Sequence, residues 1–437
     1  MKTMTGKTEN RHSTLAEVLA MKTGDQAAVH GMVHTLRDLG DVRFALLRMP
    51  QGVLQCVLSG EDMDVRDGDA VVIAGEVVRD ERAPGGAELH AQRVEVLSRA
   101  AEAMPVPIGK NKMNLSLDTE LSLRFVTLRN LRKRAVFKIQ EGIVRGFRET
   151  LQREGFTEIH SPKIVAQNAE GGANLFRMEY FGRRAYLAQS PQFYKQAMVP
   201  VYERVFEIGP VFRAEKHNTQ RHLNEYTSMD FEMGFINGFE DIMQMETEVL
   251  QNIMAVLKKD YAPQLEMLHV KLPDASSIPA VRFDEAKRMV SEKYGRPIRD
   301  PFDLEPEEEQ LISRLFAEEC GSEFVFVTHY PSKKRPFYAA DDPEDPRYTL
   351  SFDLLFRGLE VTTGGQRIHD YDTQVKKLIK KGMNPEDFAG YLMIHQYGTC
   401  PHGGLGLGLE RLTARLLGEN NVRETCLFPR DQQRIEP

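Results

Sequence analysis

The sequence lacks several features that would assign it to a common class of protein. Its 437 residues include no tryptophan and only four cysteines, which are far apart and form no CxxC pair. This cysteine usage argues against a zinc site or a disulfide framework and indicates a reducing compartment. No apolar run approaches the roughly 18 residues of a membrane span. The polar start, MKTMTGKTENRHST, lacks the apolar stretch of a signal peptide. We therefore expect a cytoplasmic protein without a membrane partner.

An excess of positive charge is also missing. The chain has 57 Lys and Arg against 64 Asp and Glu, a formal net charge of −7. A nucleic-acid partner would therefore have to meet local basic patches. The stretches RNLRKR (129–134) and KKLIKK (376–381) are such patches, and both also fit solvated helix faces.

The chain divides by its pattern into three parts. Residues 13–100 contain about five short alternating runs separated by glycine-containing turns, which is typical of a small closed barrel such as an OB-fold. The next stretch has two prolines and little periodicity, and indicates a linker. From Arg132 apolar residues recur at helical spacing as far as Gly155, and strand-like runs alternating with helices follow. We expect an α+β chain with a barrel over 1–104, a hinge over 105–131 and a larger domain over 132–437.

A polar hairpin is the most informative local pattern. The stretch FRAEKHNTQRHLNEYTSMDFEMGF (212–235) places Lys216–Asn224 between two strand-like runs. Alternation in the second strand gives Tyr226, Ser228, Asp230 and Glu232 one face. Fixed cations above a floor with an aromatic edge suit a polyphosphate that carries a flat base. Taken alone, the pattern also fits a solvated surface hairpin.

Two further elements accompany the hairpin. GGLGLGLERLTARLLG (403–418) is a glycine-rich strand followed by an amphipathic helix, and its glycines could admit a ligand or allow tight packing. GFTEIHSPKIV (155–165) joins a helix end, a strand and a proline. Together with the hairpin, these elements resemble the three motifs of class II aminoacyl-tRNA synthetases, in their usual order. Pro162, Arg213 and Arg411 fall on the motif 1 proline, the motif 2 arginine and the motif 3 arginine.

The resemblance extends over essentially the whole chain and is strongest to the compact archaeal type of aspartyl enzyme. It rests on QSPQFYKQ (189–196), RHLNEYTSMDFEM, SFDLLFRGLEVTTGGQRIH (351–369), YGTCPHGGLGLGLERL and LFPRDQQRIEP. It implies an N-terminal five-stranded OB-fold that binds the anticodon, and an antiparallel catalytic sheet flanked by helices. The implied activity is ATP-dependent attachment of L-aspartate to tRNA by a homodimer.

The resemblance also implies the ATP site. Arg213 would hold the α-phosphate and the amino-acid carboxylate, Arg411 the γ-phosphate, and the ring of Tyr226 would stack on adenine. No protein nucleophile is needed, because catalysis consists of positioning and electrostatic stabilisation. The full expected set is Arg213, Glu215, Arg221, His222, Leu223, Tyr226, Glu360, Gly408 and Arg411.

The expected metal is Mg²⁺, held by Asp353 and Glu360 together with phosphate and water. Residues seven apart on one straight strand face opposite ways. A turn or bulge at Arg357-Gly358 is therefore required before both carboxylates can reach one ion. By spacing alone, two solvent-exposed acids are an equal alternative.

Aspartate and asparagine are nearly isosteric, so charge must separate them. Lys195 and Arg367 match the family's readers of the aspartate side chain, and the asparaginyl relatives lack this lysine. Glu170 and Gln192 resemble residues that receive the substrate ammonium, while Arg213 meets its carboxylate. A lysine at position 195 taken alone would more simply be a surface lysine.

Three barrel residues match the family's anticodon readers, namely Arg37, Phe44 and Gln55, although Phe44 alone would fit a barrel core. Strict archaeal-type members tend to carry a Trp and a Lys beside the third anticodon base. Here His34 and Pro84 stand at those positions, as in relaxed members that charge both tRNA(Asp) and tRNA(Asn). Neutral drift at a loop rim is the alternative interpretation.

We therefore predict a non-discriminating aspartate–tRNA(Asp/Asn) ligase that uses ATP and Mg²⁺, with a separate amidotransferase acting on Asp-tRNA(Asn). The alternatives are a strict enzyme for tRNA(Asp), a catalytically silent RNA-binding paralogue, and an asparagine synthetase on the same catalytic fold. The last would not need the barrel with its Arg37, Phe44 and Gln55.

Overall fold

The computed structural model describes residues 12–40, 42–59, 64–166, 174–216 and 219–436. The chain forms two compact units, Met1–Arg134 and Ala135–Pro437. Within the described ranges, no helix is both long and apolar enough to cross a bilayer.

The first unit contains the expected five-stranded barrel. Its strands are β1 (Gln26–Asp38), β2 (Arg43–Met49), β3 (Gly52–Leu58), β4 (Ala70–Val78) and β5 (Glu88–Ser98), closed in the order β1-β2-β3-β5-β4. Burial alternates along β2, β3 and β4, so one face of each strand fills the barrel. Helix α1 (Leu15–Ala20) precedes the barrel and begins at a capping box of Thr14 and Glu17. The OB-fold expectation is confirmed.

The stretch expected to be a linker contains two short helices, α2 (Leu117–Ser122) and α3 (Arg124–Thr127). Helices of six and four residues are too short to give a visible apolar period. Their anchor is Arg124, which is fully buried and donates to Glu120 at 2.7 Å. This segment belongs to the first compact unit, whose boundary falls within helix α4 (Leu131–Arg153).

The second unit is built on an eight-stranded sheet in the order β12-β13-β14-β15-β16-β11-β10-β6. All neighbouring pairs are antiparallel except β10 with β6 and β12 with β13. The antiparallel sheet predicted for the catalytic domain is therefore confirmed. Its strands are β6 (Thr157–Glu158), β10 (Arg204–Phe212), β11 (Glu225–Gly234), β12 (Ala280–Arg282), β13 (Phe324–Thr328), β14 (Ser351–Phe356), β15 (Leu359–Gln366) and β16 (His402–Gly408).

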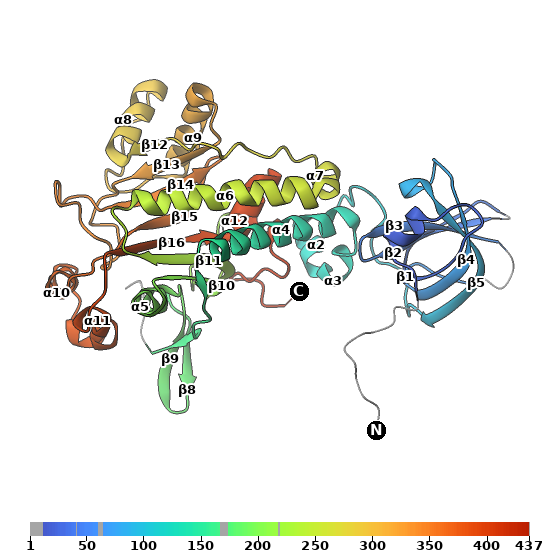
Figure 1. Ribbon diagram of the computed structural model, residues 1–437, viewed down its shortest axis with the longest axis horizontal. Helices are drawn as coiled ribbons and strands as arrows, with labels where there is room; N and C mark the ends of the chain where they lie inside the picture. The colour runs from blue at the N-terminus through green and yellow to red at the C-terminus, as the bar shows by residue number, and fades with distance from the viewer. Residues whose placement is uncertain (1–11, 41, 60–63, 167–173, 217–218, 437) are drawn as a thin grey trace. The chain divides into compact units, whose positions relative to one another are not determined.

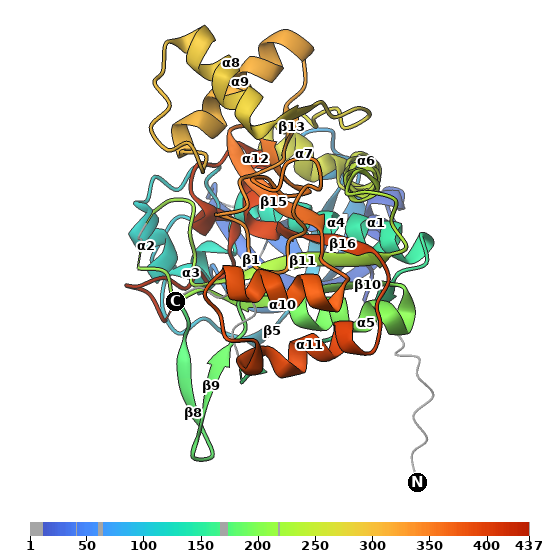
Figure 2. The same cartoon turned by 90° about the vertical axis from the view of Figure 1, so that its left-hand side faces the viewer.

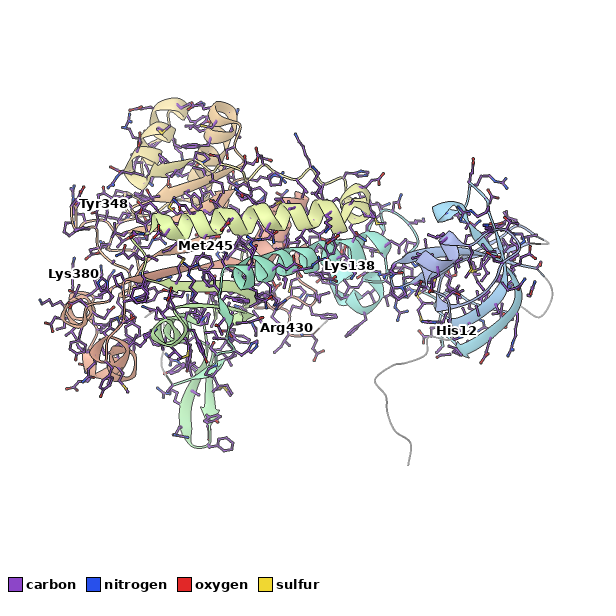
Figure 3. The ribbon with its side chains drawn as sticks, in the orientation of Figure 1. His12, Lys138, Met245, Tyr348, Lys380 and Arg430 are labelled. Atoms are coloured by element: carbon purple, nitrogen blue, oxygen red, sulfur yellow. The ribbon has the colours of Figure 1, made fainter. Side chains whose placement is uncertain are left out.

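Two long helices, α4 and α6 (Glu240–Asp260), run side by side along the sheet (Figure 1). Their close approach depends on Gly142 and Gly146: an added Cβ would lie 2.6 Å from the Leu257 side chain in the first case and 2.7 Å from the Ile253 Cα in the second. Met245 of α6, labelled in Figure 3, is buried in the core between helix and sheet. Helix α4 ends at Arg153, just before Gly155 at φ +79°, as its pattern predicts.

The remaining elements surround this frame, as Figure 2 shows from the side. A small sheet has the order β7-β9-β8. The elements are β7 (Ile164–Val165), β8 (Arg177–Tyr180), β9 (Arg183–Leu187), α5 (Gln192–Tyr202), α7 (Ala262–Leu268), α8 (Phe283–Tyr294), α9 (Pro306–Cys320), α10 (Tyr371–Lys380), α11 (Ala389–Gln396), α12 (Leu409–Leu417) and the 3-10 turns η2 (Pro385–Phe388) and η3 (Val422–Thr425). The 3-10 turn η1 (Pro84–Gly86) belongs to the first unit.

Candidate active site

A cavity of about 320 Å³ opens over strands β11, β15 and β16. The sheet supplies its floor, and the β10–β11 connection and the start of α12 supply further lining residues. All nine residues expected to bind ATP line this cavity, and so do Gln192 and Arg367 of the expected aspartate set. Residues from distant stretches of the sequence thus meet in one place.

The β10–β11 hairpin carries the adenine and α-phosphate candidates. Strand β10 ends at Phe212, so Arg213 and Glu215 lie in the connection rather than in the strand as predicted. The Asn224 side-chain amide donates to the backbone carbonyls of Arg213 at 2.7 Å and Glu215 at 3.2 Å. These side-chain hydrogen bonds hold the backbone beyond the end of the strand. The Arg213 guanidinium lies over Tyr226, 5.5 Å from the ring centroid.

The expected face of β11 is confirmed. Tyr226, Ser228 and Asp230 line the cavity, and Glu232 continues the row toward Arg367. Beside them, His222 Nε2 lies 3.7 Å from Glu215. Burial lowers the pKa of His222, with Glu215 opposing, so this imidazole is neutral at pH 7.

The end of the cavity that is expected to receive the phosphates contains Arg411 and Glu360. Arg411 is in the first turn of α12 and donates to the Glu360 carbonyl at 3.1 Å and to its carboxylate at 3.2 Å. Arg221 pairs with Glu309, a residue of α9 that the sequence did not single out. Each of these arginines therefore has a carboxylate partner.

The hairpin of β14 and β15 brings the two expected metal ligands to one face. Arg357 and Gly358 form the connecting turn, with φ values of +46° and +81°. A bulge also shifts the register between Leu354 and Leu355. It puts Glu360 opposite Leu355, two residues from Asp353, so both acids face the same way. The turn that was predicted at Arg357-Gly358 is present, and a bulge nearby in the strand pair accompanies it.

Charges around these acids give them different proton affinities. Burial raises the pKa of Asp353 to about 6, although Arg335 donates to it at 2.7 Å. Burial also acts to raise the pKa of Glu360, but Arg411, Arg335 and Arg213 together lower it. No group of three or more His, Cys, Asp or Glu side chains in the described part of the chain could hold a metal. The oxygen pair fits an ion that completes its shell with phosphate and water, as Mg²⁺ does.

The other end of the cavity contains a buried ionic cluster. Arg367 donates to Glu232 at 3.0 Å and approaches Gln192 Oε1 at 3.4 Å. Lys195 is 1% exposed and donates to Asp230 and to the Leu405 carbonyl, both at 2.9 Å. Lys195 does not line the cavity and is not the surface lysine that its position alone would suggest. Its ammonium instead supplies charge behind Asp230. Glu170 falls outside the described residues.

The glycines of β16 have two roles: some allow tight strand packing, and others leave room for a ligand. An added Cβ at Gly404 would lie 2.1 Å from the Phe231 carbonyl and 2.3 Å from Glu232, so this glycine permits strand packing. Gly406 and Gly408 instead line the cavity, where the absence of a side chain leaves backbone open to a ligand.

The three expected anticodon readers lie together on the barrel. Arg37 pairs with Phe44 across β1 and β2, and Gln55 pairs with Leu46 across β2 and β3. Alternation places all three on one face. Phe44 is not in the barrel core, because the buried positions of β2 are its neighbours on the other face. Gln55 donates to Glu88 at 2.8 Å.

His34 and Pro84 differ in accessibility. Pro84 is exposed in the turn η1. His34 is only 2% exposed, so it does not lie at a loop rim. Its ring nitrogen is 3.5 Å from Arg48, and burial together with Arg48 and Arg134 lowers its pKa to about 4.

Several cavity residues carry no signal in the sequence. Arg335 lines the cavity, bonds to Asp353 and lies 3.9 Å from the Tyr330 ring centroid. Thr363 donates to Glu360 at 3.3 Å. Glu410 accepts from the Thr227 backbone at 3.1 Å, and burial raises its pKa to about 7. A polar stretch such as YPSKKRPFY (330–338) has no period that would mark Arg335 as a site residue.

Known proteins resemble this chain in sequence and in fold. Residues 116–432 match the family model of tRNA synthetases class II (D, K and N). The chain is 48% identical to an aspartate–tRNA(Asp/Asn) ligase of Deinococcus radiodurans, covering 97% of this chain and 98% of that protein. It is 47% identical to the protein of that name in Thermus thermophilus, covering 97% and 99%. An aspartate–tRNA(Asp) ligase of Pyrococcus abyssi is 39% identical, covering 97% and 98%.

Solved structures agree with this assignment. An asparaginyl-tRNA synthetase from Pyrococcus horikoshii complexed with asparaginyl-adenylate aligns with TM-score 0.91 and 32% identity, over 98% of this chain and 100% of that chain. An aspartyl tRNA synthetase from Entamoeba histolytica aligns with TM-score 0.87 and 27% identity, over 100% and 96%. With the family model matching most of the chain and relatives matching nearly all of it, this protein belongs to the class II aminoacyl-tRNA synthetases, in the family of the D, K and N enzymes.

Proposed function

We propose that this synthetase attaches L-aspartate to tRNA through aspartyl-adenylate, and that it accepts both tRNA(Asp) and tRNA(Asn). One observation carries the first half of the proposal: a single cavity is lined by Arg213, Arg221 and Arg411 at one end and by Arg367 and Gln192 at the other. A triphosphate and an amino acid can therefore lie with their reacting groups adjacent.

In this arrangement the aspartate α-carboxylate attacks the α-phosphorus of ATP, an oxygen–phosphorus bond forms, and pyrophosphate leaves. Arg213 stabilises the negative charge at the α-phosphate, and its contact with Tyr226 keeps it beside the adenine platform. Arg411 and Arg221 hold the outer phosphates. The 3′ end of tRNA then takes the acyl group, and AMP leaves.

Asp353 and Glu360 would hold Mg²⁺, the ion that best fits two carboxylates sharing one face. When bound, the ion would neutralise part of the phosphate charge. The carboxylate of Glu360 is already ionised beside Arg411, since the surrounding arginines lower its pKa.

Specificity for aspartate over asparagine follows from the charged cluster. Arg367 faces the cavity, and Lys195 adds a second positive charge beneath Asp230. An aspartate carboxylate can accept hydrogen bonds from the Arg367 guanidinium through both oxygens, whereas an asparagine amide has one acceptor oxygen and is uncharged.

The broad tRNA range is supported by two relatives. The Deinococcus and Thermus proteins, at 48% and 47% identity, are both named for tRNA(Asp/Asn). Of the two positions that resemble the relaxed members, the exposed Pro84 supports the proposal, whereas His34 is buried. Asp-tRNA(Asn) would then pass to a separate amidotransferase. We further propose a cytoplasmic location and a homodimer. The exposed Pro162 and Ile164, which is 45% exposed, lie on the motif 1 segment and support the dimer.

ATP–pyrophosphate exchange tests the activation step. We expect exchange that depends on aspartate and is at least about 100-fold weaker with asparagine, the scale expected when buried donors lose their partner. Exchange absent with aspartate in folded protein would favour the silent paralogue. Free asparagine formed from aspartate, ATP and ammonia would favour an asparagine synthetase.

A further inference from the structure

Glu309 is a buried carboxylate beside the phosphate end that the proposed reaction leaves without a role. It lies in the first turns of α9 and is 6% exposed. Its neighbour Glu308 is also buried but has other partners, because it forms ion pairs with Lys287 at 2.7 Å and with Arg296 at 2.8 Å. The two adjacent acids of α9 therefore contact different sets of basic residues.

The contacts of Glu309 lead directly to the cavity. One carboxylate oxygen accepts from Arg221, and it also accepts from the backbone N–H of Glu360 at 3.1 Å. Arg221 lines the cavity, whereas Glu309 does not and lies behind it. Glu309 thus ties a phosphate-binding arginine to the strand that carries Glu360.

Arg221 needs such a partner for physical reasons. Its long side chain loses substantial rotamer freedom when it is fixed for ligand binding, and it shares the cavity with Arg213 and Arg411. The carboxylate of Glu360 already accepts a hydrogen bond from Arg411, so Arg221 uses a different carboxylate. A carboxylate held by a helix fixes one edge of the Arg221 guanidinium and leaves donors on the others.

We propose that Glu309 is a positioning residue that holds Arg221 toward the phosphates of ATP. The inference rests on the proposed ATP site and deepens it. Glu309 touches no substrate in this account and acts through Arg221.

The decisive variant is Glu309→Gln, which keeps the shape and an acceptor for the Glu360 N–H but removes the charge. We expect the KM for ATP in pyrophosphate exchange to rise about tenfold, equivalent to ~1.4 kcal/mol, while the KM for aspartate stays unchanged. The Kd of a non-hydrolysable ATP analogue, measured by calorimetry, should rise by the same factor.

Two controls separate positioning from general damage. Glu308→Gln makes the same chemical change one residue away, and it should lower the melting temperature without altering the KM for ATP. In an Arg221→Gln background, Glu309→Gln should have no further effect on analogue binding, because its partner is already gone.

An unchanged or lowered Kd for the analogue in Glu309→Gln would overturn the proposal, and a lowered value would mean that Glu309 competes with ATP for Arg221. A full additional loss in the Arg221→Gln background would overturn it as well. Failure of wild-type exchange would instead count against the proposed function, since analogue binding reports on Glu309 without any turnover.

Discussion

At the scale of single residues, the cavity depends on charges that are buried in compensating sets. Arg367, Lys195, Asp230 and Glu232 form one such set at the end of the cavity where we propose that aspartate binds. Burial acts to raise the pKa of Glu232, but Arg367 and Lys195 lower it overall. Removing one member therefore leaves an opposite charge without compensation.

Lys195→Met tests this dependence. The change removes the cation beside Asp230 and Glu232, so the site becomes more negative and repels the aspartate carboxylate. We expect the KM for aspartate in pyrophosphate exchange to rise about 100-fold, at the low end of the ~2–5 kcal/mol that loss of a buried charge partner costs.

Lys287→Met is the matched control, because Lys287 is also buried and pairs with Glu308 at 2.7 Å away from the cavity. Both variants should lose about 3 kcal/mol of unfolding free energy in denaturant titrations. Only Lys195→Met should affect aspartate. An equal effect on KM in both would show that the lysines matter for stability alone.

Glu246 of α6 makes the stability of the folded protein depend on pH. Burial raises its pKa from 4.5 to about 8, with the Thr362 hydroxyl opposing. Because the folded-state pKa is raised, the associated stability is fully present below pH 4.5 and is lost as the pH rises toward 8. Across that window the loss is at most about 1.4 kcal/mol per pH unit.

Glu246→Gln should flatten the fall in melting temperature between pH 5 and pH 8 and should make the protein more stable at pH 8. Thermal melts across that range measure both effects. If the melting temperature fell equally with pH in the wild type and in Glu246→Gln, the pH dependence could not be assigned to Glu246.

At the scale of elements, the contact between α4 and α6 limits side-chain size. An added Cβ at Gly146 would meet backbone, the Ile253 Cα at 2.7 Å, whereas at Gly142 it would meet the ends of the Leu257 and Tyr261 side chains. Backbone cannot move aside as a side chain can. Gly146→Ala should therefore destabilise the protein by about 1–3 kcal/mol despite the higher helix propensity of alanine.

Gly142→Ala is the paired comparison, and it should cost less because leucine and tyrosine rotamers can adjust. Denaturation midpoints of the two variants give the measurement. If Gly146→Ala were the milder change, the two helices would be more loosely packed than the structure indicates.

Elements with a strong local period could be predicted from the sequence. The five barrel strands, the helix that ends before Gly155 and the shared face of Tyr226, Ser228 and Asp230 all follow from alternation or helical spacing. The need for a turn at Arg357-Gly358 also followed, because strand geometry would otherwise separate Asp353 from Glu360.

Features that depend on distant contacts could not be predicted in this way. Helices α2 and α3 are too short to show a period. Arg335 and Glu309 reach the site only through contacts with the β14–β15 hairpin, where Arg335 meets Asp353 and Glu309 meets the backbone of Glu360. Whether His34 faces RNA or the protein interior depends on packing, and the structure buries it.

At the scale of the whole molecule, the proposed function assigns tRNA choice to the barrel and amino-acid activation to the second unit. Pro84 is exposed, so Pro84→Lys can add a cation without disturbing the core. We expect it to reduce charging of tRNA(Asn) relative to tRNA(Asp) about tenfold, within the ~1–3 kcal/mol of base discrimination.

Pyrophosphate exchange without tRNA should be unchanged in Pro84→Lys, which makes the variant its own control. His34→Trp is a poorer probe, because the buried site would be overpacked at a cost of about 1–3 kcal/mol. Equal charging of both tRNAs by wild type and Pro84→Lys would remove Pro84 from the account of specificity.

The most direct measurement is aspartylation of pure tRNA(Asp) and tRNA(Asn) transcripts, side by side at one fixed salt concentration. The account predicts comparable charging of both. Charging of tRNA(Asp) alone would contradict the non-discriminating function, and charging of neither in protein that activates aspartate would contradict the ligase function itself.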